Sequence, residues 1–146
     1  MSRSGYTDDY DDIGSLNLYR ATVARTIAGK RGQAFLREMA DALDAMPVKE
    51  LIPYELVAKY GVCAIGSVAV ARGLDVSNID ELGPDFADDV AAAFGIARSL
   101  AAEIAYENDE RSPWATKDPE TPAQRWTRMR AWVDENLADG IEPEKK

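Results

Sequence analysis

Apolar residues recur every three or four positions through most of the chain, which is the spacing of amphipathic helices. Five segments follow this spacing, and the pattern therefore predicts a mainly α-helical fold. The predicted buried faces are Leu16, Tyr19, Val23 and Ile27; Phe35, Leu36, Met39, Leu43 and Met46; Phe86, Val90 and Phe94 or Ala93; Leu100, Ala101 and Ile104; and Trp126, Met129, Val133 and Leu137.

The segment Gly61 to Gly73, GVCAIGSVAVARG, differs from these because apolar or small residues lie on every side of a helix drawn through it. Only Arg72, near its end, is charged, so no polar stripe is left to face water. We expect a central helix here, with the other helices packed around it. The sequence thus predicts a single-domain bundle of about six helices.

Several boundaries of these helices are marked by glycine, proline or capping residues. The turn at residues 29–32 joins the first two helices closely, which favours an antiparallel hairpin. Thr121, Pro122 and Gln124 have the spacing of a capping box, which starts the last helix. Residues 48–60 lack a clear period, so we expect irregular or short structure there, with an edge strand over 54–57 as an alternative.

The chain has 146 residues, enough for one domain with a sizeable core. Residues 1–12 are predicted to be a flexible acidic arm, docking if at all through Tyr6 and Tyr10. Residues 13–138 form the single helical domain, and residues 139–146 a flexible tail. No apolar run reaches the length of a membrane span and no secretory signal is visible, so we expect a cytoplasmic protein without membrane contact.

Charge is distributed unevenly along the chain, which carries 17 basic and 26 acidic residues and a net charge of −9. Residues 13–37 contain basic side chains and no acid, whereas in residues 75–110 Arg98 stands alone among many acids. The net charge argues against a general affinity for nucleic acid. The two blocks are candidate contact surfaces for a protein partner.

The candidate partner-binding residues come from these blocks and from one aromatic position. A basic patch at the 29–32 turn would dock the acidic arm or a partner, with an anion site as the alternative. The acidic block could imitate nucleic acid toward a DNA-binding protein. Trp132 points away from the Trp126 face of its helix, so it is either exposed, as at an interface, or packed in the core against the loop at Trp114. The residues are Arg20, Arg25, Lys30, Arg31 and Arg37; Asp85, Asp88, Asp89 and Glu103; and Trp132.

Catalytic and metal chemistry find little support in the composition. There is no histidine, which excludes Ser-His and Cys-His pairs and removes the commonest general base and metal ligand. Cys63 is the only cysteine, and its apolar neighbours in the sequence indicate an inert structural thiol. We therefore expect no enzyme activity, cofactor or metal.

The segment 90–104 has the spacing of a helix-turn-helix, with Gly95 at the bend. Arg98 and Ser99 would contact DNA in that case. However, acids such as Glu103 dominate the second helix, and they would be repelled by phosphate. A plain helical corner is the favoured interpretation, and a helix-turn-helix DNA-binding regulator is the alternative function.

Five stretches together resemble the small acidic, uncharacterised proteins of proteobacterial phages and prophages. They are MSRSGY, GKRGQAFL, VCAIG, FGIARSLAAEIAYENDE and RWTRMRAWV. The resemblance implies a context but no activity, cofactor or catalytic residue. The predicted function is that of a non-catalytic phage or prophage accessory protein, which binds another protein of the phage, the host or the host's defences.

Overall fold

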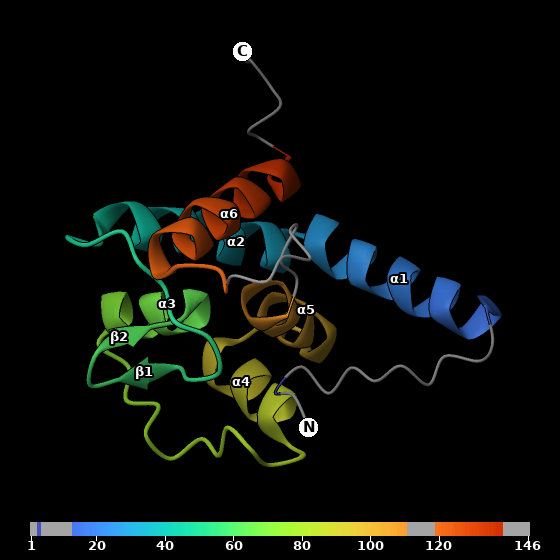
Figure 1. Cartoon of the computed structure of the whole chain (residues 1–146). Coiled ribbons are helices and arrows are strands. Elements are labelled where there is room, and N and C mark those ends of the chain that lie inside the picture. Colours follow the sequence, from blue (N-terminus) through green and yellow to red (C-terminus); the bar gives the residue numbers. More distant parts are fainter. Residues whose placement is uncertain (1–2, 4–12, 111–118, 139–146) are drawn as a thin grey trace.

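The computed structural model describes residue 3, residues 13–110 and residues 119–138, with side chains 13–17 left out. Within these residues six helices and a two-stranded sheet form a mainly α-helical domain, which confirms the predicted fold class (Figure 1). The elements are α1 (Ile13–Ala28), α2 (Lys30–Ala45), β1 (Val57–Ala58), β2 (Gly61–Val62), α3 (Ala64–Arg72), α4 (Phe86–Phe94), α5 (Arg98–Asp109) and α6 (Pro122–Asn136).

Two helices, α2 and α5, connect the bundle. The α2 helix packs against α1, α3 and α6, and α5 packs against α1, α3, α4 and α6. The predicted faces of α2, α4 and α5 are buried, except for Met46, which is half-buried and follows the end of α2. Phe94 rather than Ala93 completes the face of α4. The largest fully buried side chains are Phe86, Leu36, Met39, Leu43, Leu51, Leu56, Ile65, Leu100, Ile104, Met129, Val68 and Val90.

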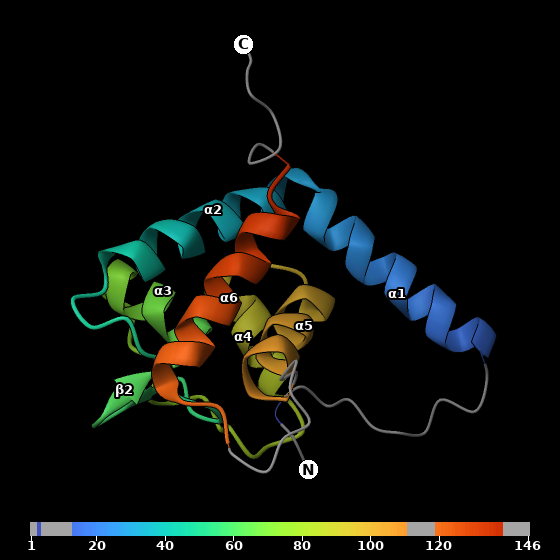
Figure 2. The same ribbon diagram turned by 45° about the horizontal axis from the view of Figure 1, so that its top comes forward.

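The first two helices are separated by Gly29 alone, and they do not form the predicted antiparallel hairpin. In Figures 1 and 2 they meet in an open bend, so that α2 continues across the body while α1 extends away from it. A Cβ on Gly32 would lie 1.9 Å from the carbonyl oxygen of Thr26, so the start of α2 presses directly on the end of α1. One linking residue is too few for α2 to double back along α1.

The predicted central helix, residues 61–73, is shorter than expected. Gly61 and Val62 form β2, which pairs antiparallel with β1 in the register Val57 to Val62. The Ile52 N–H donates to the Val62 carbonyl, so extended backbone here is hydrogen-bonded on both sides. The helix begins at Ala64, and it is buried only as far as Ala69.

Two further boundaries follow their local sequence signals. Gly95 ends α4 with φ of 74°, a left-handed conformation that glycine adopts easily, and the α4–α5 corner follows. Thr121 and Gln124 form the predicted capping box at the start of α6. Among the described residues no helix is long and apolar enough to cross a membrane.

Candidate functional site

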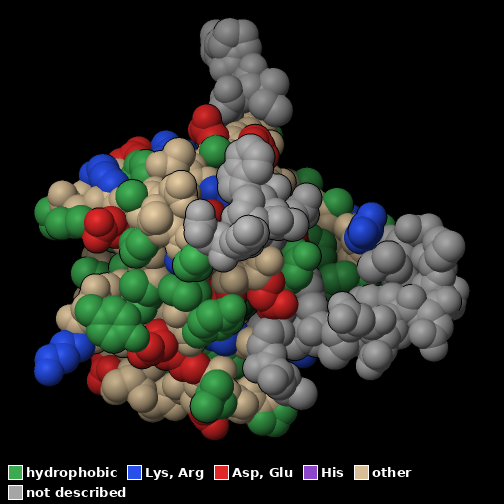
Figure 3. Space-filling view, in the orientation of Figure 1, with side chains coloured by type: hydrophobic (Ala, Val, Ile, Leu, Met, Phe, Trp, Pro, Cys, Tyr) green, Lys and Arg blue, Asp and Glu red, His purple; other side chains and the backbone are tan. Residues whose placement is uncertain are grey.

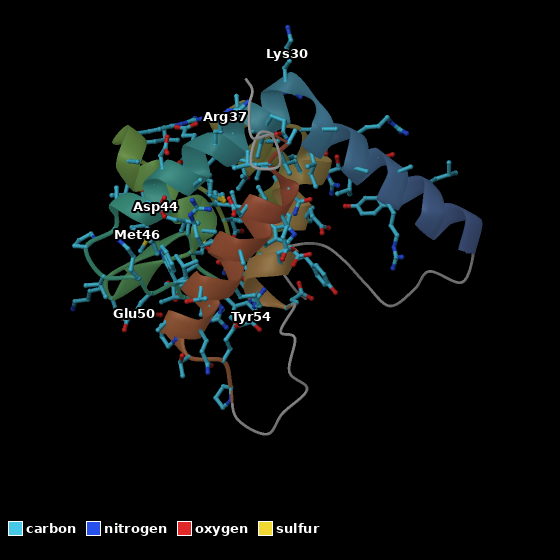
Figure 4. The ribbon with its side chains drawn as sticks, turned by 90° about the horizontal axis from the view of Figure 1, so that it is seen from above. Lys30, Arg37, Asp44, Met46, Glu50 and Tyr54 are labelled. Atoms are coloured by element: carbon cyan, nitrogen blue, oxygen red, sulfur yellow. The ribbon has the colours of Figure 1, made fainter. Side chains whose placement is uncertain are left out.

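A hollow of the surface lies between the end of α2, the loop after it, β2 and α3. It has a volume of about 350 Å³ and an apolar lining, and we call it the hairpin groove. Figure 4 shows Met46 and Glu50 at the α2 side of this region. The lining residues are Ala42, Ala45, Met46, Pro47, Val48, Glu50, Tyr60, Gly61, Val62, Ser67, Val70 and Ala71.

Large apolar side chains are exposed around the groove. Val48 is 59% exposed, Tyr60 72% and Val70 61%. Val57 pairs directly with Val62 across the hairpin and is also exposed, so it extends the same apolar face. Figure 3 shows hydrophobic side chains gathered over the area of the hairpin. Such clustered exposure is typical of interaction surfaces.

This surface exists because α3 is not surrounded on all sides. The sequence pattern predicts that the whole segment is buried, yet Val70 and Ala71 face solvent because no described element covers their side of α3. Sequence reasoning therefore missed the groove. The sequence pattern at the groove is a helix with apolar residues on every side and no polar face. A buried core helix and a helix with an exposed binding surface both have this pattern.

Glu50 is the only charged residue in the lining of the groove, and no cation pairs with its carboxylate in the described part of the chain. The neighbouring Lys49 points elsewhere, since its Nζ donates to the carbonyl oxygens of Asp44 and Met46 and lies 5.8 Å from the Trp126 ring centroid. The Tyr60 hydroxyl donates to Glu55 at 2.6 Å, and this hydrogen bond raises the pKa of Tyr60.

The predicted basic residues are all exposed, but they do not make one compact site. A hollow of about 240 Å³ lies at the α1–α2 bend, lined by Arg25, Lys30 and Arg31 together with Ala97 and Leu100 at the start of α5. Lys30 projects from the bend in Figure 4, and Arg37 lies further along α2. Gly29 caps α2 without a side-chain hydrogen bond. Arg20, on α1, is exposed and does not line this hollow.

The acidic block likewise does not form one surface. Asp85, Asp88 and Asp89 are exposed at the start of α4, where Asp88 pairs with Arg98 at 2.9 Å, while Glu103 is half-buried on α5. Other acids of the block make contacts within the chain or are withdrawn from the surface. Asp75 and Asp80 accept backbone N–H groups in their own turns, and Glu81, Glu107 and Asp109 are partly or fully buried.

The helix-turn-helix segment does form a corner, but its second helix is enclosed. Leu100, Ala101, Ala102, Ile104 and Ala105 are all buried in α5, and Arg98 is the exposed residue at its start while Ser99 is half-buried. A recognition helix has to insert a solvent-exposed face into the major groove. The burial of α5 argues against that use.

Two side chains of α6 lie against the rest of the fold. Trp132 is half-buried and packs against the core, which is the second of its two interpretations. Arg125 has the spacing of an outer-face residue, yet it is only 8% exposed. The Arg125 Nε donates to the Asn108 carbonyl at 2.9 Å, and Arg128 donates to that of Glu107. These arginines satisfy the last carbonyl groups of α5, which is why they point inward. Trp114 lies outside the described residues.

The least expected finding is that Arg3, from the predicted flexible arm, is buried at the centre of a polar cluster. Its side chain is 2% exposed and binds Asp109, whose side chain is fully buried. Docking through Arg3 corrects the expectation that the arm docks only through Tyr6 and Tyr10, which themselves lie outside the described residues. Burial opposes the charge on Arg3, but its contacts with Cys63 and Asp109 outweigh burial and raise the pKa of Arg3.

The surroundings of Cys63 therefore include a charged group, although its neighbours in the sequence predict apolar surroundings. The thiol is buried, caps α3 by accepting the Gly66 N–H at 3.4 Å, and lies 3.7 Å from Nη1 of Arg3. In the described ranges no group of three Cys, Asp or Glu side chains has the arrangement of a metal site. Comparison of the chain with protein-family models, curated proteins and solved structures found no match.

Proposed function

We propose that this chain is a non-catalytic protein-binding domain whose partner docks in the hairpin groove. The observation that carries the proposal is the apolar groove rimmed by the exposed side chains of Val48, Tyr60 and Val70. Apolar anchors that enter a preformed hollow supply most of the binding energy of protein interfaces. The groove takes aliphatic or aromatic side chains of a partner segment.

The negative charge in the groove adds a second requirement, which concerns the charge of the partner segment. Glu50 lines the hollow, and within the described residues no cation neutralises it. A partner segment with a lysine or arginine beside its apolar anchor would pair with this carboxylate, and a segment with an acid there would be repelled. The occupant we propose is a basic, apolar segment of another protein. The resemblance to phage and prophage proteins suggests that the partner is a protein of the host or of the host's defences.

The experiment compares three tagged baits in a nuclease-treated extract of the organism that encodes the chain. They are the wild type, Val70→Asp in the groove and Leu82→Asp, which makes the same change at an 85% exposed position outside it. We expect a protein retained by the wild type and by Leu82→Asp and reduced at least about 10-fold with Val70→Asp. Equal retention by all three baits would contradict docking in the groove.

A fourth bait tests the acidic surface, which remains the other protein-binding candidate. It carries Asp85→Asn, Asp88→Asn, Asp89→Asn and Glu103→Gln, replacements at exposed or half-exposed sites. We expect it to retain the partner. Loss of the partner with this bait and not with Val70→Asp would move the contact to the acidic block and support the nucleic-acid mimic instead.

The alternative function, a DNA-binding regulator, predicts retention on DNA at low salt that is lost with Arg98→Ala. Arg98 is exposed and pairs with Asp88, so this substitution leaves the fold intact. We expect no binding of wild type to DNA above that of Arg98→Ala, because α5 has no free face to enter a groove.

A further inference from the structure

The side chain of Arg3 is held by a complete set of contacts for a planar cation. Its Nε and Nη2 donate to the two oxygens of Asp109 at 2.7 and 2.8 Å, and its Nη1 donates to Glu81 at 3.2 Å. The guanidinium carbon lies 5.1 Å from the centroid of the Phe86 ring. A two-pronged carboxylate and an aromatic face together recognise a guanidinium group and discriminate against an ammonium ion.

The walls of this site come from separate parts of the fold. Asp109 ends α5, Phe86 begins α4, Glu81 lies in the loop before α4, and Cys63 caps α3. Arg3 itself belongs to no helix or strand. Its side chain can therefore leave the site without the unwinding of any described element. We call these four wall residues the Arg3 site.

The same carboxylates also fix the loop that leads into the hairpin. Asp109 accepts the Tyr54 N–H at 3.0 Å, and Glu81 accepts the Leu56 N–H at 2.8 Å. Tyr54 is the described non-glycine residue with a positive φ, 70°, a conformation that persists only when its surroundings hold it. The occupant of the Arg3 site thus helps to order residues 54–56.

We propose that the Arg3 site is a guanidinium-binding site in which Arg3 is a detachable ligand from the same chain, and that its release admits another alkylguanidinium group and loosens residues 54–56. The ligand class is the side chain of arginine or a small molecule of the same chemistry. The buried carboxylate of Asp109, left beside the half-buried carboxylate of Glu81 without their shared cation, would carry a large desolvation penalty, so the empty site binds a replacement. The inference stands apart from the proposed function, because none of the four wall residues lines the hairpin groove.

The test uses Arg3→Ala in the full chain with ethylguanidinium as the probe. We expect the folding equilibrium constant of Arg3→Ala to fall at least about 100-fold. Low-millimolar ethylguanidinium restores part of this loss and slows hydrogen exchange at the Tyr54 and Leu56 amides. Ethylammonium has the same charge but lacks the planar pair of N–H donors of a guanidinium group, so it restores little of the lost stability. No rescue, or equal rescue by both cations, would overturn the proposal.

Two further variants keep the test decisive if Arg3→Ala does not fold. In that case the yield of folded protein on addition of ethylguanidinium becomes the readout, and an unchanged yield counts against the site. Arg3→Lys retains a cation at the position, and we expect faster exchange at the Tyr54 and Leu56 amides than in the wild type. The double variant Arg3→Ala/Asp109→Asn must show no rescue, because one wall of the site is then missing.

Arg3 of a second copy is another source of the same ligand. A mixture of Arg3→Ala chains, which have an empty site, with Asp109→Asn chains, which have an intact Arg3, separates the two sources. We expect neither stabilisation of the Arg3→Ala chain nor a mixed dimer, as the assignment to the same chain requires. Mutual stabilisation with dimer formation would overturn that assignment.

Discussion

Arg3 and Asp109, 106 positions apart in the chain, are joined by an ion pair in which both carboxylate oxygens accept from the guanidinium. Neither side chain reaches solvent to a measurable extent, with 2% and 0% of their surfaces exposed. A buried pair of this kind costs little while it is complete and much when one member is removed. The start of the described chain is in this way fixed to the end of α5.

The pair predicts strong coupling between two substitutions. Arg3→Ala and Asp109→Asn each lower the free energy of unfolding by about 3–5 kcal/mol, because each leaves a buried polar group without its partner. The double variant loses less than the sum, with a coupling energy of roughly 2 kcal/mol. Urea unfolding of the four proteins measures this, and additive losses would show that the two side chains act independently.

Gly66 predicts a steric limit at the start of α3. A Cβ at this position would lie 1.8 Å from the carbonyl oxygen of Leu56, so the helix and the loop have to separate when it is added. We expect Gly66→Ala to destabilise the protein by about 3 kcal/mol, as overpacking of a rigid contact does.

Gly29→Ala is the matched control for this substitution. A Cβ there meets only the Arg25 carbonyl oxygen at 3.4 Å, an ordinary contact. Its effect on the melting temperature is expected to be several-fold smaller than that of Gly66→Ala. If the two variants had the same melting temperature, close packing at Gly66 would not be the cause of the destabilisation.

The groove predicts an effect of charge on partner binding. Glu50→Lys replaces the carboxylate that we expect to meet a basic residue of the partner, so affinity falls about 10-fold and the loss shrinks as salt is added. Asp89→Lys makes the same change at an exposed site on α4 and serves as the control. Calorimetric titration with the captured partner distinguishes them, and an equal loss in both would point to long-range repulsion by net charge.

The Arg72–Glu38 pair predicts a loss of stability in acid. Both oxygens of Glu38 accept from Arg72 at 2.7 Å, and these hydrogen bonds lower the pKa of Glu38 below its ordinary 4.5, against the opposing effect of burial. The folded chain therefore takes up this proton at lower pH than the unfolded chain. The stability that the pair contributes is present above pH 4.5 and disappears as pH falls through the folded pKa.

Glu38→Gln tests this prediction. The pair is half-exposed, so we expect the variant to lose less than about 1 kcal/mol at neutral pH and to match the wild type in acid. Glu135→Gln removes an exposed acid that has no ion pair in the described part of the chain, and its pH profile is expected to follow the wild type. Parallel profiles for wild type and Glu38→Gln would contradict the assignment.

Helix positions could be read from the sequence because their signals are local. The faces of α2 and α4, the stop at Gly95 and the capping box of Thr121 and Gln124 depend on residues within a few positions of one another. Amphipathic spacing does not say which neighbour covers a face, however. For that reason Val70 was predicted to be in the core, although it is exposed at the groove.

The polar interior could not be read in the same way. Arg125 has the spacing of an outer-face residue, and it is buried because the carbonyl oxygens of Leu51 and Asn108 lie beside it in the folded chain. Arg3 stands among acids and small polar residues that predict an exposed arm. Only the tertiary structure brings Asp109 to it, and no local pattern encodes a contact at that separation.

The order in which the chain is synthesised gives the burial of Arg3 a temporal consequence. Arg3 is synthesised before the residues that enclose it, since Cys63, Glu81 and Asp109 follow it in the chain. At elongation rates of about 5–20 residues per second, Asp109 follows Arg3 by roughly 5 to 20 s. Through that interval the guanidinium stays in water, and α1 and α2 have time to form first. The contact between Arg3 and Asp109 therefore cannot form until α1 to α5 have all been synthesised.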